Sequence, residues 1–355
     1  MAKVNPDDRQ IEYWQKRAEL DFIAGEKKGL VLAKELKTNY EKAMRSLEND
    51  IRVFYSKYAT LDKIDYTEAK KLLNKNELRS FEIELKELMD YAKKHNFTLE
   101  EKLNIKLMSL KTRVSRLEEL KTQMYFELTK LSKDTEDKLY NYFSNSYEDG
   151  YYKSIYNVGK TIGYKSSFAR LNTKLIDKAI KKEYTLGNYS VGINKIWQNT
   201  ENLMQILNQE IPRGLTLGYN AKKLAGMVSK KLDTNYNSTV RLIRTEYNYL
   251  MNQSTKDGYE ACGIKQYQIL ATLDGRTSDI CIEMNGEIFD FSKLEVGVNY
   301  PPFHPNCRTT TIPYFEPDEI DEEIPIDIKV GVTREGERVK IPEGMSYKEW
   351  LKSIE

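Results

Sequence analysis

Cysteine and histidine are scarce in this chain of 355 residues, which contains three cysteines and two histidines. Three cysteines make no disulfide framework, so we expect reduced thiols in an intracellular protein. The chain begins MAKVNPDDRQIEYWQKRAEL, which lacks the apolar segment of a secretory signal. It also lacks any run of roughly 20 apolar residues that would span a bilayer. The sequence therefore favours a protein that is made in a cytoplasm, stays there unless a larger assembly carries it out, and has no membrane partner.

Net charge is low as well, at +2 from 56 basic and 54 acidic residues. The whole molecule has no charge signature of nucleic-acid binding, so such binding would have to come from local segregation of charge. Charged residues make up 31% of the chain and apolar residues 40%. This combination suits long, solvent-exposed helices better than one compact globule, and the length suggests two or three domains.

The first third of the chain has the apolar spacing of helices. Residues three or four positions apart form one apolar stripe: Leu32, Leu36, Tyr40, Ala43, Leu47, Ile51, Phe54 and Tyr58. The helices that we expect here cover residues 1–60, 66–96 and 99–133. Thr98 and Glu101 have the spacing of a capping box at the start of the third helix. We interpret residues 1–135 as an elongated region of long helices, and we assign no functional role to His95 near its middle.

A basic segment follows, and we interpret residues 136–189 as helical. Between residues 151 and 182, eight basic residues accompany a single acid, a net charge of +7. Tyrosine and phenylalanine side chains are interleaved with them, an arrangement that can bind phosphates and stack on bases. The alternative is a solvated amphipathic helix. NVGKTIG is no nucleotide-binding loop, because Ser154 stands where that motif needs glycine. The candidate DNA contacts are Lys160, Lys165, Arg170, Lys174 and Lys178.

Residues 190–315 predict helices followed by a small α+β subdomain. Two helices end near residue 232, and Ser238 or Thr239 could cap a third. The apolar period then changes to two in QYQILATL, which predicts a strand. SDICIEMN predicts a short helix, and EIFDF and RTTTIPYF predict strands. The fold class is thus mainly α with a small α+β C-terminal domain, and the acidic EPDEIDEE opens a linker and tail over residues 316–355.

The octapeptide PPFHPNCR (residues 301–308) places a histidine and a cysteine three positions apart in a proline-stiffened stretch. Together with Cys281, His304 and Cys307 offer three donors for a structural zinc ion, which takes thiolate and imidazole ligands. A closed structural site needs four ligands, and Asp274 or Asp279 could supply the fourth, or Ser278 could stand where a cysteine would complete C-x-x-C. A tightly packed turn without a metal is the alternative.

Catalysis at the same residues is a further alternative. A nucleophilic Cys–His pair is poorly placed, because Pro305 locks the two residues within one turn. A deaminase would need H-x-E, but Pro305 and Asn306 follow His304. What stays open is a metal-assisted nuclease in which Asp274, Glu246 and His304 surround a divalent ion.

Several motifs occur in the order found in MuF-like phage minor head proteins, the phage head-morphogenesis family. They are IWQNTENLMQILNQEIPRGLTLGYNAKKLAGMV, RLIRTEYNYLMN, YQILATLDGRTSDICIEMNGEIFD and PPFHPNCRTTTIP. The resemblance covers about residues 190–315, and the opening YWQKR and closing MSYKEW resemble full-length versions from phages of Gram-positive hosts.

The resemblance implies a low-copy capsid protein inside the head near the portal, needed for assembly or DNA delivery and without an established enzymatic activity. Its implied partners are the portal protein, the major capsid or scaffolding protein, and phage DNA. Some members carry cysteine at the position of Ser278, which completes a zinc-type quartet that this chain lacks. In this interpretation five charged residues form a buried or half-buried frame of ion pairs, which orients the site more than it stabilises it. They are Arg244, Glu246, Asp274, Arg276 and Arg308.

Overall fold

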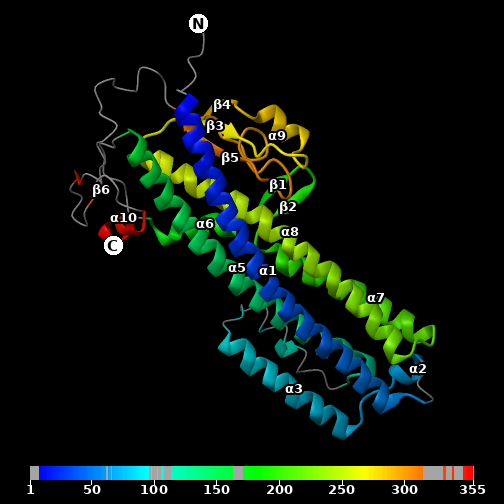
Figure 1. Ribbon diagram of the computed structural model, residues 1–355. Coiled ribbons are helices and arrows are strands. Elements are labelled where there is room, and N and C mark those ends of the chain that lie inside the picture. The colour runs from blue at the N-terminus through cyan, green and yellow to red at the C-terminus, as the bar shows by residue number, and fades with distance from the viewer. Residues whose placement is uncertain are drawn as a thin grey trace. The chain divides into compact units, whose positions relative to one another are not determined.

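Helices dominate the fold, and small antiparallel sheets lie in the C-terminal part, as the sequence predicts (Figure 1). This computed structural model describes residues 8–60, 63–64, 66–95, 97, 102, 105–107, 113–162, 171–314, 331–332, 338–339 and 347–354. The helices are α1 (Asp8–Tyr58), α2 (Tyr66–Ala69), α3 (Lys75–Lys94), α5 (Arg116–Ile162), α6 (Thr173–Lys181), α7 (Lys195–Thr216), α8 (Ala221–Ala261), α9 (Asp279–Met284) and α10 (Tyr347–Ile354). No helix in these ranges is long and apolar enough to cross a membrane.

The chain forms two compact units that each combine segments distant in sequence. Unit 1 contains Met1–Val31, Leu139–Asn194 and Arg241–Glu355. Unit 2 contains Leu32–Lys138 and Lys195–Val240. The predicted division cuts the chain into consecutive stretches, and its boundaries stay a prediction.

Unit 2 is helical, and its core contains the predicted stripe of α1. Leu36, Leu47 and Ile51 are fully buried, since the 3.6-residue period keeps them on one side of the helix. Leu47 and Ile51 belong to a cluster with apolar residues of α5, α7 and α8. A second cluster joins the apolar face of α3 to Phe126 of α5. Burial of this periodic stripe explains why the first predicted helix is confirmed.

The expected helices over residues 66–96 and 99–133 are not continuous. Asn74 begins α3 with a capping box, because its side chain accepts from the amide of Glu77 while the Glu77 carboxylate accepts from the amide of Asn74. Leu72 forms a β-bridge with Ser115, so the next described long helix begins only at Arg116. The predicted cap at Thr98 lies outside the described residues. His95 is the C-terminal cap of α3 and stacks on Tyr91, with ring centroids 4.0 Å apart.

No helix boundary occurs at Ser238 or Thr239. Both hydroxyls bond the carbonyl four residues back, Ser238 to Thr234 at 3.1 Å and Thr239 to Asn235 at 3.3 Å. They are therefore satisfied inside a continuous helix instead of capping a new one. The predicted break is wrong, and α8 runs for 41 residues.

Unit 1 contains the sheet that positions the candidate site. The strands of the fold are β1 (Tyr184–Leu186), β2 (Tyr189–Val191), β3 (Gln266–Leu270), β4 (Ile288–Asp290), β5 (Thr310–Tyr314), β6 (Gly331–Val332) and β7 (Arg338–Val339). β3 lies between β4 and β5, and both pairings are antiparallel. Tyr267 and Ile269 of β3 are buried in a core that also contains residues of α5 and the end of α8. The predicted strands are thus confirmed, as is the short helix α9.

The hairpin of β1 and β2 was not predicted, because residues 136–189 were interpreted as helical. Gly187 has φ +58° at its tip and is followed by Asn188, and this Gly-Asn pair is a hairpin-turn signal. The helical interpretation holds for most of the rest of the described part of this segment, which forms the end of α5 and all of α6.

Glycines allow close approach between helices of unit 1. A Cβ atom added at Gly258 of α8 would lie 1.8 Å from Ser154 Oγ and 2.9 Å from the carbonyl oxygen of Tyr151, both on α5. A Cβ atom at Gly25 of α1 would lie 1.5 Å from the Tyr247 hydroxyl. Neither separation is possible for a real side chain, so these two positions require glycine.

Candidate functional site

Cys281, His304 and Cys307 lie together in unit 1. Cys281 Sγ is 3.3 Å from His304 Nε2 and 3.7 Å from Cys307 Sγ, and all three donor atoms lie within 4.8 Å of one another. Both cysteines are 2% exposed, and His304 is half-buried. Cys281 comes from α9, while the other two residues come from the octapeptide before β5. The structure thus brings together the three donors that the sequence suggests.

Polar residues of α8 fix the octapeptide in place. The side-chain amides of Asn248 and Asn252 donate to the carbonyl oxygen of Thr309, at 2.9 Å and 3.3 Å. The backbone amide of Asn306, which has φ +60°, donates to Thr245 Oγ1 at 3.1 Å. Sequence reasoning missed these α8 residues. The available signal was Asn at i and i+4 on a helix, on the side that carries buried apolar residues.

The pKa values of the two thiols and the imidazole are shifted in different directions by their contacts. The pKa of Cys281 is lowered, first because the Cys307 thiol donates a hydrogen bond to its sulfur and also because His304 lies beside it. The same hydrogen bond raises the pKa of Cys307, and burial raises it further. Contact with Cys281 raises the pKa of His304. The cluster therefore presents an electron-rich sulfur at Cys281, as metal ligation requires.

The spacing of the donors fits a zinc ion. With Zn–S bonds of about 2.3 Å, two sulfurs of a tetrahedral site lie about 3.8 Å apart, and the observed separation is 3.7 Å. The fourth position is open in the described residues. Ser278 Oγ, three positions before Cys281, is buried, and its hydroxyl contributes to the lowered pKa of the Cys281 thiol. Ser278 or a water molecule could complete the coordination.

Asp274 lies outside the cluster of the three donors. Its carboxylate accepts two hydrogen bonds of 2.6 Å from the guanidinium of Arg308, which holds the pKa of Asp274 well below its usual range. Arg276 approaches the same carboxylate at 3.5 Å and is 81% exposed. The pairs tie the turn after β3 to the residue that follows Cys307.

The predicted ion-pair frame is smaller than expected, because Arg244 and Glu246 are not part of it. Arg244 is exposed and pairs with no acid among the described residues. Glu246 is 1% exposed, and burial raises its pKa to about 8, while the Tyr184 hydroxyl beside it lowers the pKa slightly. Asp274, Glu246 and His304 are therefore not assembled as the nuclease alternative requires.

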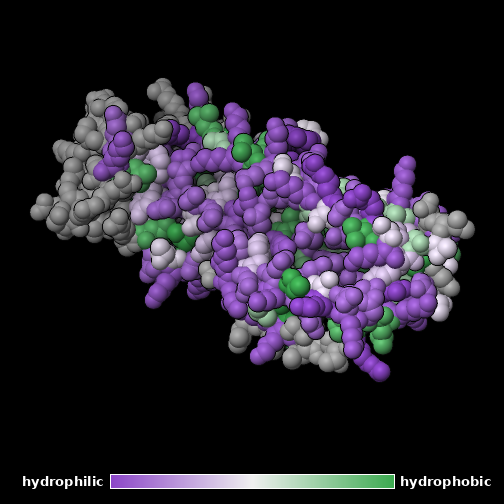
Figure 2. Space-filling model, turned by 90° about the horizontal axis from the view of Figure 1, so that it is seen from below, coloured by the Kyte–Doolittle hydropathy of each residue, from purple (hydrophilic) through white to green (hydrophobic). Residues whose placement is uncertain are grey.

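The basic segment has a different architecture from the one expected. Three of its tyrosines are core residues. Tyr151, Tyr152 and Tyr156 are at most 8% exposed, so they are not free to stack on bases. Lys174 and Lys178 project from α6 into solvent opposite the buried Ile176 and Ile180. Figure 2 shows that hydrophilic side chains dominate the face that it presents. The side chains of Lys160, Lys165 and Arg170 lie outside the described part of the structure.

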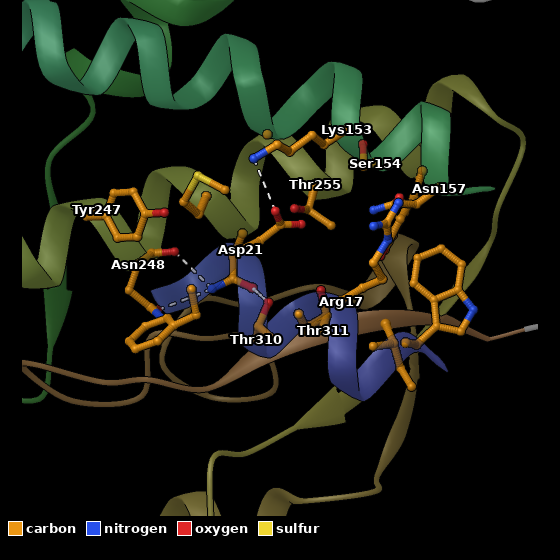
Figure 3. Close-up of a pocket in the computed structure, with 18 residues that line it drawn as sticks. Arg17, Asp21, Lys153, Ser154, Asn157, Tyr247, Asn248, Thr255, Thr310 and Thr311 are labelled. Carbon is orange, nitrogen blue, oxygen red and sulfur yellow. Dashed lines mark hydrogen bonds and ion pairs between the residues drawn. The ribbon is translucent and has the colours of Figure 1, made fainter. Parts of the chain in front are cut away.

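A cavity of about 70 Å³, lined by both polar and apolar side chains, lies elsewhere in unit 1, between α1, α5, α8 and β5 (Figure 3). Lys153 of α5 binds Asp21 of α1 at 3.1 Å across it and Asp149 at 2.9 Å. One water needs about 10–15 Å³, so the cavity has room for several. Sequence analysis did not find this cavity, because its residues come from four separated segments.

Comparisons with known proteins bear on one part of the chain. Residues 205–312 match the family model described as Phage Mu protein F like protein. An uncharacterized protein of Haemophilus influenzae (strain Rd) is 26% identical over 109 residues, which is 31% of this chain and 24% of that protein. The chain thus matches about a quarter of that relative's length. No solved structure matches the chain.

Proposed function

Because residues 205–312 belong to the family of Phage Mu protein F-like proteins, we propose that this chain is a phage minor head protein with a structural role in head morphogenesis. It acts inside the head near the portal during procapsid assembly, DNA packaging or DNA delivery. Its partners are the portal protein and the major capsid or scaffolding protein. It is present in the host cytoplasm during assembly and then in the virion. The family match is the observation that carries this proposal.

Quantitative mass spectrometry of purified proheads and virions tests the proposal. We expect the chain in both particles, at a copy number far below that of the major capsid protein. A phage with a nonsense codon in this gene should form fewer infectious particles, and supplying the chain in trans should restore them. Particles that contain the portal protein but lack this chain would contradict the proposal.

A structural zinc ion at Cys281, His304 and Cys307 belongs to the same proposal. The 3.7 Å sulfur separation supports it, because a tetrahedral metal imposes nearly this distance. A zinc ion would supply ligand bonds that join α9 to the segment before β5. Its role would be to stabilise a small subdomain, since burial of the two cysteines leaves little room for a substrate.

Weak, sequence-independent contact with packaged DNA is a second role, favoured by the exposed basic face of α6. Lys174 and Lys178 lie four positions apart, so both project from the side opposite the buried isoleucines. Buried tyrosines leave phosphate attraction as the binding force, without base readout. The double variant Lys174→Gln/Lys178→Gln should weaken duplex binding and reduce its salt dependence.

The matched control for this α6 variant is Lys93→Gln/Lys94→Gln, which makes the same charge change at the exposed end of α3. It should leave DNA binding unchanged. Equal effects of the two double variants would show that α6 is not the interface.

A further inference from the structure

Cys281 and Cys307 have a second chemical option besides metal ligation. Both are free thiols, and their sulfurs are 3.7 Å apart. A disulfide bond is about 2.05 Å long, so one sulfur has to move by roughly 1.7 Å. The third cysteine, Cys262, is also buried and forms no disulfide, but it is not part of this cluster. The chain therefore contains one matched pair and one natural control.

The two sulfurs are held unequally. Cys307 lies on the segment that Asn248 and Asn252 hold through the Thr309 carbonyl, so its backbone is fixed to α8. Cys281 lies on α9, a helix of six residues. Ser278 precedes the first of these residues, and its side chain makes no capping hydrogen bond. A short helix without such a cap is held weakly. The required movement can therefore come from the first turn of α9, while Asn285 at its other end stays bound to the amide of Ala271 at 2.9 Å, just after β3.

We propose that Cys281 and Cys307 are an oxidative modification site, which forms an intramolecular disulfide when the chain leaves a reducing cytoplasm for an oxidising surrounding. The proposal rests on the proposed function, because a virion protein makes this passage. In the cytoplasm the thiols stay reduced and are available for a metal. Outside the cell no thiol pool maintains that state.

The co-reactant is a small oxidant such as hydrogen peroxide, because both sulfurs are 2% exposed and leave no room for a larger reagent. The Cys281 sulfur attacks one peroxide oxygen, which breaks the O–O bond, gives a sulfenic acid at Cys281 and releases one water. The Cys307 sulfur then attacks the Cys281 sulfur. The S–S bond forms, and the hydroxyl group of the sulfenic acid leaves with the Cys307 proton as a second water. Two protein thiols are oxidised and one hydrogen peroxide is reduced to two waters.

Thiol mapping of the full chain tests this proposal. The chain is purified with a chelator and a reductant, and the reductant is then removed. It is incubated with hydrogen peroxide, blocked with N-ethylmaleimide, digested and examined by mass spectrometry. We expect a peptide that links Cys281 to Cys307, together with alkylated Cys262. Cys307→Ser should instead give an oxidised Cys281 without a link, whereas Cys262→Ser should still form the link. Complete alkylation of all three cysteines, or a link that includes Cys262, would overturn the proposal.

The same mapping on virions separates this proposal from the proposed function. The chain extracted from virions should contain the link, and the chain from reducing cell lysates should not. Reduced thiols in virions would overturn the modification proposal. Absence of the chain from virions would contradict the head-protein function, while the result for the purified chain would be unaffected.

Discussion

Glu246 should make the stability of this chain fall steeply as the pH rises. The carboxyl is 1% exposed, and burial raises its pKa from 4.5 to about 8. The native state therefore binds a proton that the unfolded chain has lost between these pH values, so stability decreases with pH across that window. At about 1.36 kcal/mol per pKa unit, the full effect is about 5 kcal/mol, of which about 3 kcal/mol is already lost at pH 7.

The substitution Glu246→Gln removes the ionisable group and keeps its shape. Urea unfolding at pH 5, 7 and 9 should show that the variant gains on the wild type as pH rises, by about 4 kcal/mol over this range. Differences between the two proteins isolate Glu246 from other titrating groups. Tyr184→Phe removes the hydroxyl that lowers the pKa of Glu246, so it should extend the loss of stability to higher pH. A difference between wild type and Glu246→Gln that stays constant from pH 5 to 9 would refute this reasoning.

Three further predictions follow from contacts in the structure. Gly258→Ala should destabilise the chain by about 1–3 kcal/mol in urea unfolding, because its Cβ atom would overlap α5. Gly226→Ala on the same helix meets no atom within 4 Å and should stabilise it by about 0.5–1 kcal/mol. His304→Ala should lower the zinc content from one ion per chain in elemental analysis, whereas His95→Ala should not, and equal content in both variants would exclude the proposed ligand. The α6 double variant should reduce the slope of log affinity against log salt by about 1.8, at about 0.9 per phosphate contact, measured by fluorescence anisotropy.

Periodicity in the sequence was sufficient where burial alone decides the structure. The stripe of α1 was predicted because its apolar residues repeat every three to four positions, and Leu36, Leu47 and Ile51 are indeed fully buried. Short polar motifs that mark helix starts and turns were overlooked in the prediction. The capping box at Asn74 and the Gly-Asn turn of the β1–β2 hairpin are both readable from the sequence, yet long helices were expected at both places.

The donor cluster was predictable from residue types, because cysteines and a histidine are rare here and lie within one short stretch. The residues that hold the cluster in place were not predictable. Asn248 and Asn252 bind a backbone carbonyl, and every residue has one, so the sequence does not mark the partner. The predicted ion-pair frame was too large for a related reason. Glu246 lies in a charged motif with Arg244, but the helix turns the two side chains to different surroundings, one buried and one exposed.

The core of unit 1 extends beyond the stretch of sequence that this chain shares with other proteins. The family match ends inside β5 at residue 312, but the core against which β3 packs includes Trp14 of α1 and Tyr156 of α5. A fragment cut at residues 205 and 312 would lack Trp14 and Tyr156 and would leave this core incomplete. Fusions or exchanges between relatives should therefore transplant α1 and α5 together with the matched residues.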